Sequence, residues 1–274
     1  MRELTVPYPG GSLRFGRRTL VMGVLNVTPD SFSDGGRHFD ARRAIAAGQA
    51  MGDADILDIG GESTRPGAAP VSIEEEIRRV VPVIRALRKR FVSIDTSKPE
   101  VAEAAIAAGA RMINDVTALA DPRMARIAAR AKVLVILMHM QGTPRTMQKR
   151  PRYRNVVKEV LAFLRQRVDA AVRAGIDRRR LLIDPGIGFG KTLAHNLEIL
   201  RRVGEFRVLR LPLVLGTSRK AFIGKITGRT AGERRDGTAA TVALGIAKGA
   251  DIVRVHDVKE MADVARVADA ICRT

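Results

Sequence analysis

The sequence predicts an α/β fold, a closed (β/α)8 TIM barrel with an N-terminal β-hairpin cap, on three observations. Apolar, β-branched runs alternate with longer amphipathic, Ala-rich stretches along all 274 residues, in about eight pairs. Several helical stretches end in Gly and pass directly into the next apolar run, as in "AAGARMINDV" from Ala107, a usual junction between a helix and a strand. No break in composition interrupts the series. We therefore expect one domain over 1–274 and prefer the barrel to an open doubly wound sheet.

The individual elements follow from this alternation in chain order. Residues 1–18, with Pro-Gly-Gly at 9–11, predict a hairpin that covers the bottom of the barrel. The β-branched apolar runs predict strands near 20–26, 55–61, 91–97, 111–116, 132–140, 181–186, 212–218 and 252–257. The amphipathic stretches predict helices near 40–51, 72–90, 99–108, 122–131, 155–174, 193–203, 236–248 and 259–271.

Some connections that follow strands are much longer than the turns at the other face of the barrel. A connection normally takes about 4 to 6 residues, whereas these occupy 27–39, 62–71, 141–154 and 219–235. The first includes most of "NVTPDSFSDGG", in which small polar groups surround the isolated Phe32. Because long loops on a rigid scaffold commonly act as mobile lids, we interpret these connections as lids over a site.

Composition favours a cytoplasmic protein. Hydrophobic residues make up 46% of the chain and charged residues 28%, which allows a buried core and argues against disorder. The single cysteine, Cys272, excludes an intramolecular disulfide and suits a reducing compartment. The first residues lack the apolar core of a signal peptide, and no apolar run approaches the ~20 residues of a membrane span. We therefore expect no membrane partner.

The net charge of +19 raises the hypothesis of a nucleic-acid partner. The distribution of the charge argues against it, because the arginines recur on helical faces among carboxylates. Aromatic residues make up only 4% of the chain and Trp is absent, so no platform for base stacking is visible. We expect no nucleic-acid partner; a nucleic-acid-binding barrel would instead show strongly salt-dependent RNA affinity.

Polar residues gather at the predicted carboxyl end of each strand. In a parallel barrel these ends lie on one face, where active sites are built. Arg254 and His256 are two residues apart, so their side chains point to the same side of the last strand. From the first strand to the last, these ends carry Asn26, Glu62 to Thr64, Asp95, Asn114 and Asp115, His139, Asp184, Thr217 to Lys220, and Arg254 and His256.

"DPGIGFGKT", residues 184–192, is close to a phosphate-binding P-loop but fails its spacing. That motif requires Gly where the chain has Pro185, so we interpret the segment as a flexible turn between strand and helix. A turn does not explain Asp184, a carboxylate at the end of the buried run "LLIDPG" that must find hydrogen-bond donors. The N–H groups of a bound heterocycle would supply them.

The remaining polar motifs also have structural interpretations. "GESTRPGA" could be a polar turn with an exposed Arg65, Arg219 and Lys220 could be solvated loop charges, and "RVHDV" could hold an Arg–Asp pair at the rim. His139 is more often expected as a buried histidine with its hydrogen bonds satisfied than as a metal ligand. The chain has four histidines and no cysteines at ligand spacing, so a zinc site is disfavoured.

Eight segments, in order and with the expected spacing, resemble the dihydropteroate synthase family. They span residues 20–258 and read "NVTPDSFSDGG", "DIGGESTRPGA", "SIDT", "INDV", "LMHMQGTP", "DPGIGFGK", "GTSRKAFIG" and "RVHDV". The resemblance implies a transferase of folate biosynthesis that condenses 6-hydroxymethyl-7,8-dihydropterin diphosphate with 4-aminobenzoate and releases 7,8-dihydropteroate and diphosphate. The alternative in the wider pterin-binding family is a methyltransferase acting with a corrinoid partner.

The resemblance also implies roles at the pterin end of the site. Asp184 would accept the pterin N–H groups and Asn114 would orient the ring. Asp95 would stabilise the positive charge that develops as the C–O bond breaks. Lys220 would donate to the pterin and border the aminobenzoate. The implied catalytic residues are Asp95, Lys220, Arg254 and His256.

At the diphosphate end, the resemblance implies that Arg254, His256 and Asn26 face the leaving group. Arg65 would reach over from the second lid, and Thr64 would support the same side. Asn26 would also be a ligand of Mg²⁺, a hard ion that prefers oxygen donors and phosphate.

The aminobenzoate slot is implied to form between two lids and the rim. Phe32 and Pro66 would close over Phe189, Ser218 and Lys220. Position 221 is Ala where many relatives carry Ser, which can alter contacts of the last lid. The family further implies a homodimer formed through the last helices.

Overall fold

The computed structural model describes residues 3–28, 37–63, 70–144 and 146–273, and the predicted strands lie within these ranges. They are β3 (Leu20–Asn26), β4 (Ile56–Gly60), β5 (Val92–Asp95), β6 (Met112–Asp115), β7 (Leu134–Met138), β8 (Leu181–Asp184), β9 (Val214–Leu215) and β10 (Ile252–Val255). All pair in parallel, in the order β8-β7-β6-β5-β4-β3-β10-β9. A parallel bridge between Ile183 and Leu213 then brings β8 beside β9. The prediction of a TIM barrel is confirmed.

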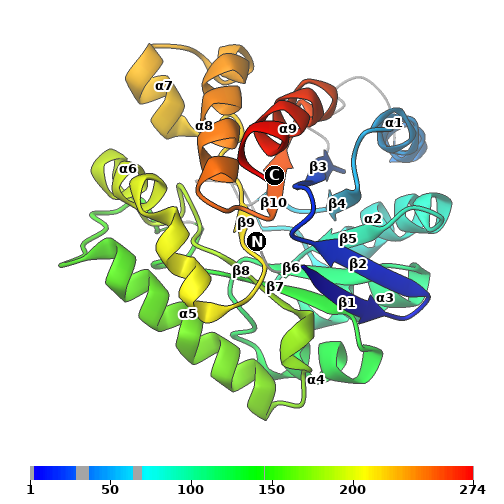
Figure 1. Ribbon diagram of the computed structural model, residues 1–274. Helices are drawn as coiled ribbons and strands as arrows, with labels where there is room; N and C mark the ends of the chain where they lie inside the picture. The colour runs from blue at the N-terminus through cyan, green and yellow to red at the C-terminus, as the bar shows by residue number, and fades with distance from the viewer. Residues whose placement is uncertain (1–2, 29–36, 64–69, 145, 274) are drawn as a thin grey trace.

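Helices surround the strands on the outside of the barrel (Figure 1). The α-helices are α1 (Arg37–Ala50), α2 (Ile73–Leu87), α3 (Pro99–Ala108), α4 (Pro122–Ala131), α5 (Val156–Arg173), α6 (Leu193–Arg201), α7 (Ala221–Thr227), α8 (Arg235–Ala247) and α9 (Val258–Cys272). Short 3₁₀ helices are η2 (Arg178–Arg180), η3 (Val203–Leu209) and η4 (Ala231–Glu233). No helix in the described ranges is long and apolar enough to cross a bilayer.

The connection 219–235 was predicted as a long loop without a helix, whereas the structure has helices within it. It contains α7 and η4, because Phe222 and Ile223 bury an apolar turn and Gly228, at φ +73°, ends the helix in the left-handed region. α7 is shorter than the stretch over which an apolar period can be recognised. The neighbouring strand was predicted over 212–218 and is shorter, since regular pairing is confined to β9.

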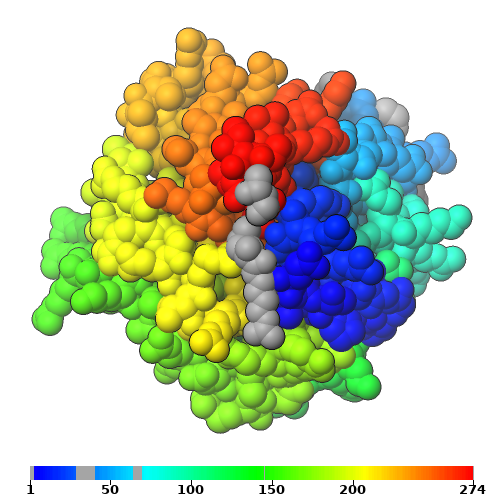
Figure 2. Space-filling model, in the orientation of Figure 1, coloured from blue at the N-terminus to red at the C-terminus, as the bar shows by residue number. Residues whose placement is uncertain are grey.

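The N-terminal hairpin caps one end of the barrel, as predicted. Its strands β1 (Leu4–Tyr8) and β2 (Gly11–Phe15) are antiparallel, and Val6 and Phe15 are buried against the apolar residues inside the barrel. Tyr8 packs edge-on against Phe91, with ring centroids 4.8 Å apart. The blue hairpin and the red helix α9 both appear on this end of the molecule (Figure 2).

The core has two compartments, one inside the barrel and one between strands and helices. Along β8 Leu182 points into the interior cluster and Leu181 and Ile183 into the outer one. Because side chains alternate along a strand, Asp184 returns to the interior two residues beyond Leu182. The apolar residues therefore fill the hairpin end of the barrel, and polar residues take the inward positions at the other end.

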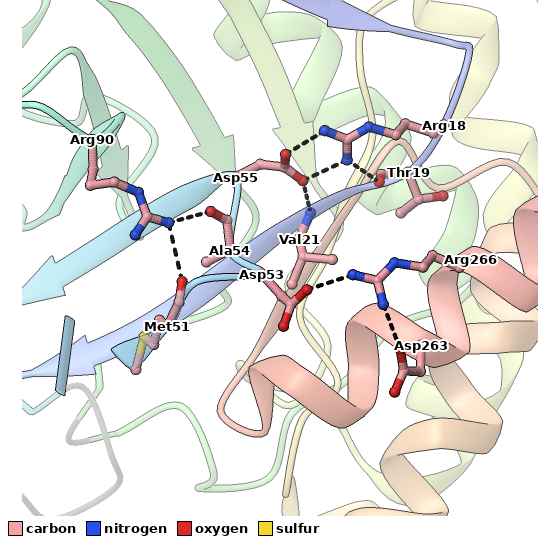
Figure 3. Close-up of polar contacts among 10 residues, drawn as sticks. All are labelled: Arg18, Thr19, Val21, Met51, Asp53, Ala54, Asp55, Arg90, Asp263 and Arg266. Carbon is pink, nitrogen blue, oxygen red and sulfur yellow. Dashed lines mark hydrogen bonds and ion pairs between the residues drawn. The ribbon is translucent and has the colours of Figure 1, made fainter. Parts of the chain in front are cut away.

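Arginine–carboxylate contacts connect helix α9 and the segment before β3 to the residues that precede β4, at the hairpin end of the strands (Figure 3). Asp55, which precedes β4, accepts hydrogen bonds from the backbone amide of Val21 at 2.9 Å and from Arg18 Nη1 at 2.8 Å. Arg266 of α9 pairs with Asp53 at 2.5 Å. These arginines have carboxylate partners within the fold.

Candidate active site

The predicted polar residues meet at the carboxyl ends of the strands. Gly216 marks the meeting point, because a Cβ there would lie 3.7 Å from Lys220 Nζ and 3.9 Å from Asp184 Oδ2. The same Cβ would lie 3.8 Å from Arg254 Cβ. Asp184, Lys220 and Arg254 therefore lie around one point at the carboxyl ends of the strands, which we call the mouth of the barrel, although 70 residues separate the first from the last.

A buried ion network forms the floor of this mouth. Arg254 Nε donates to Asp58 Oδ2 and Arg254 Nη2 to Asp95 Oδ2, each at 2.6 Å. Asn114 Nδ2 donates to the same Asp58 oxygen at 3.0 Å. One oxygen each of Asp58 and Asp95 is buried without a hydrogen-bond partner among the described residues. The floor therefore holds two carboxylate oxygens whose hydrogen-bonding capacity is unused within the described residues.

Asp58 was not among the predicted site residues. It lies in the middle of the apolar strand "ILDIG" and is fully buried, so it is not among the polar residues at strand ends. A carboxylate inside a parallel strand that is covered on both faces is itself a signal, because it must be paired or hydrogen-bonded. That signal would have identified it.

The network shifts the protonation equilibria of its members. Burial raises the pKa of Asp95 to about 7, and the nearby carboxylate of Asp58 acts in the same direction while Arg254 opposes it. Burial lowers the pKa of Arg254, but Asp58 and Asp95 outweigh that effect and raise it. Arg254 is thus a permanent cation, whereas Asp95 titrates in the neutral range.

Lys220 and Phe189 line the neighbouring wall. The Lys220 ammonium donates to the carbonyl of Ile187 and lies 4.8 Å from the centroid of the Phe189 ring, a cation–π distance. Burial lowers the pKa of Lys220 to about 8, with Asp184 opposing. Burial raises the pKa of Asp184, and Lys220 opposes that shift in turn. Asp184 also accepts a 2.7 Å bond from the amide of Gly186.

His256 and Ser218 form the third part of the rim. Ser218 Oγ lies 3.0 Å from His256 Nδ1 and accepts a hydrogen bond from the His256 amide at 3.1 Å. The adjacent pair Arg219–Asp257 is an ion pair. Of the two charges that the sequence left open as solvated loop residues, Arg219 is therefore structural, whereas Lys220 enters the site.

Asn26 lies at the tip of β3, beside Asp95. A Cβ on Gly60 would be 3.7 Å from Asn26 Oδ1 and 3.6 Å from Asp95 Cβ, so both side chains flank the same glycine. No group of three acidic, histidine or cysteine residues in the described ranges could hold a metal alone. The amide oxygen of Asn26 is a ligand type that suits a hard cation such as Mg²⁺.

Phe32, Thr64, Arg65 and Pro66 lie outside the described residues. The ends of the second connection are described, and they are held together. Lys98 Nζ donates to Glu62 Oε2 and to the carbonyl of Val71, both at 2.7 Å, and pairs with the buried Glu76. The start and the end of this connection are thus fixed beside the rim.

Comparison with known proteins agrees with the arrangement. Residues 22–256 match the family described as pterin binding enzyme. The dihydropteroate synthase of Escherichia coli is 48% identical over 255 residues, covering 91% of this chain and 90% of that protein. A structure of the Xanthomonas albilineans dihydropteroate synthase with 4-aminobenzoic acid has a TM-score of 0.92 at 47% identity, covering 98% of both chains. Its complex with 7,8-dihydropteroate has a TM-score of 0.88 at 45% identity, covering 97% of this chain and 98% of that one.

Proposed function

The chain belongs to the pterin binding enzymes, and on that premise we propose its activity and the roles of its site residues. It is a dihydropteroate synthase, a transferase that joins 6-hydroxymethyl-7,8-dihydropterin diphosphate to 4-aminobenzoate in folate biosynthesis. The C–O bond to the diphosphate breaks, the arylamine nitrogen forms a bond to the pterin methylene, and the amine loses a proton. The observation that carries this proposal is the single mouth shared by Asp184, Lys220 and Arg254.

The pterin end of the mouth presents acceptors and one donor to the ring. Asp184 offers its carboxylate to adjacent N–H groups, a bidentate arrangement that gives short, charge-assisted hydrogen bonds. In the floor beneath it, Asn114 is hydrogen-bonded to Asp58, and Asp58 and Asp95 each keep one buried oxygen without a partner among the described residues. Lys220 supplies the donor from the wall. The ring is bound by groups that the barrel holds in place before it arrives.

Asp95 carries the electrostatic part of catalysis in this proposal. When cleavage runs ahead of amine attack, positive charge develops on the pterin methylene, and an ionised Asp95 fixed by Arg254 stabilises it. At the other end, His256 and Arg254 face the leaving diphosphate, and Asn26 would hold Mg²⁺ there. That ion would supply charge neutralisation of the leaving group.

The aminobenzoate slot is proposed to use the outer rim. Phe189, Ser218 and Lys220 form its described wall, and Phe32 and Pro66 complete it from the two connections. The arylamine is a neutral nucleophile at pH 7, so the slot has to orient it rather than activate it with a strong base. Thr64 and Arg65 complete the diphosphate side in the same proposal.

The test is direct synthesis. We expect the purified protein with pterin diphosphate, 4-aminobenzoate and Mg²⁺ to release dihydropteroate and diphosphate in equal amounts, and metal chelation to abolish the reaction. A parallel reaction with methyltetrahydrofolate and a corrinoid protein should give no methyl transfer. Methyl transfer without dihydropteroate would instead establish the corrinoid-dependent alternative.

Two further proposals concern the setting of the enzyme. A homodimer through the last helices is supported by large apolar side chains exposed on α8 and α9, among them Leu244 and Val267, each 62% exposed. A cytoplasmic location is supported by the single cysteine, which suits a reducing compartment.

A further inference from the structure

Lys191 is a buried cation that the proposed chemistry does not use. It is the lysine of the P-loop-like motif, and only 3% of it is exposed. Its Nζ lies 2.9 Å from the carbonyl oxygens of Gly186 and Phe189 and 2.9 Å from His139 Nδ1, with the His139 carbonyl at 3.4 Å. The ammonium form of Lys191 has three donors for these four acceptors.

The protonation of the surrounding groups fits this arrangement. Burial lowers the pKa of His139 to about 3, and the charge of Lys191 acts in the same direction, so the ring is neutral and accepts at Nδ1. Burial lowers the pKa of Lys191 to about 7, and the carboxylate of Asp184 opposes that shift. His139 is thus a satisfied interior histidine, as predicted, and its partner is Lys191.

The segment 185–190 is wrapped around this ammonium. Gly186, Gly188 and Gly190 have φ values of +67°, +86° and +62°, the left-handed region that favours glycine. A Cβ at Gly186 would collide with the His139 carbonyl, and one at Gly190 with the Gln141 carbonyl. Alternate glycines therefore let the chain curl tightly against the end of β7, with carbonyls turned inward.

The carbonyls of this segment divide between different donors. Lys220 takes that of Ile187, Gln148 that of Gly188 at 2.7 Å, and Tyr153 that of Gly190 at 2.8 Å. The carbonyls of Gly186 and Phe189 rest on Lys191. Removal of the ammonium would leave the Phe189 carbonyl without this donor and the Gly186 carbonyl with only the Phe189 amide, at 3.1 Å, next to the Phe189 ring.

We propose that Lys191 is a positioning residue for the aminobenzoate slot: its ammonium fixes the segment 185–190 and so places Phe189 and the Ile187 carbonyl against Lys220. The proposal rests on the function proposed above in assigning Phe189 to that slot. It assigns different roles to the two lysines that contact this segment. Lys220 contacts the substrates, and Lys191 holds the wall that Lys220 packs against.

The test compares Lys191→Met with Lys158→Met, the same change at an exposed position of α5. For Lys191→Met we expect the KM for 4-aminobenzoate to rise at least tenfold, while the Kd of pterin diphosphate stays within threefold of the parent. Lys158→Met should change neither. A residue with a purely structural role would lower Tm and the active fraction and leave both constants unchanged, and that result would overturn the proposal. Equal losses for both substrates would also overturn it.

Hydrogen exchange of the peptide 185–190 tests the positioning step without any substrate. We expect the amides of this peptide to exchange faster in Lys191→Met than in the parent protein, and at the parental rate in Lys158→Met. Parental exchange rates in Lys191→Met would contradict the proposal. Should Lys191→Met fail to fold, Lys191→Gln, which keeps two donors and loses the charge, is measured by the same criteria. A parent enzyme that makes no dihydropteroate would refute the proposed function alone, since the exchange result stands independently.

Discussion

Arg254 shows how a barrel can hold charges in its interior. Taking a guanidinium and two carboxylates out of water costs more than one ion pair returns unless further hydrogen bonds satisfy them. Here Asp58 accepts from both Arg254 and Asn114, so one side chain joins three strands. Removing Arg254 would leave two buried carboxylates side by side. Its structural and chemical contributions therefore cannot be separated by deleting it, which makes Asp95 the better probe.

Asp95 should set the acidic limb of the pH profile. Its carboxyl must be ionised to stabilise positive charge, and its pKa is raised to about 7, so kcat/KM for pterin diphosphate should fall about tenfold per pH unit below that value. Lys220 must keep its proton, and its pKa is lowered to about 8, so a basic limb should begin there. Initial rates between pH 5 and 10 give both limbs.

Asp95→Asn is the matched control for that profile. It should slow turnover much more than it weakens pterin diphosphate binding, because the lost interaction strengthens in the transition state. It should also remove the acidic limb and keep the basic one. An acidic limb that survives in this variant would assign the titration to another group.

At the scale of elements, the strands could be predicted closely and the last connection could not. Seven strands are apolar runs bounded by turn residues, and their predicted centres agree with the structure. The strand that contains β9 was predicted too long, because "LPLVLGTS" is apolar beyond the two residues that pair. Helix α7 was not predicted, because one buried turn is too short to show a helical repeat of apolar residues. The partners of Asp58, which are Asn114 and Arg254, lie far from it in sequence, so no local pattern identifies these pairs.

The hairpin end of the strands should determine stability and not rate. Asp55→Ala leaves the Val21 amide without its acceptor, so we expect the free energy of unfolding to fall by about 1–3 kcal/mol. Asp53→Ala removes only a solvent-exposed ion pair with Arg266 and should cost less than about 1 kcal/mol. Both variants should keep the parental kcat and KM. Denaturant unfolding and steady-state rates check these expectations, and a lower kcat in Asp55→Ala with intact stability would contradict them.

At the scale of the whole molecule, the residues that stabilise the fold and the residues of the proposed site lie at opposite ends of the barrel axis. Apolar side chains and the hairpin close one end, and the inward positions at the other end are polar. Parallel strands alone require this convergence, which is why the site could be located from strand ends before any coordinates were known. The ion pairs within the site could not be predicted in this way. Whether Arg254 pairs with Asp58, with Asp95 or with neither depends on the register of the strands.

The central claim is that one mouth binds the heterocycle at Asp184 and the leaving diphosphate beside His256. Calorimetric titration of 6-hydroxymethyl-7,8-dihydropterin and of its diphosphate, in Mg²⁺, tests it with two variants. Asp184→Asn should weaken both ligands by similar factors of tenfold or more, whereas His256→Ala should weaken the diphosphate and leave the unphosphorylated pterin unchanged. Parental pterin affinity in Asp184→Asn, or equal losses for both ligands in His256→Ala, would contradict the account.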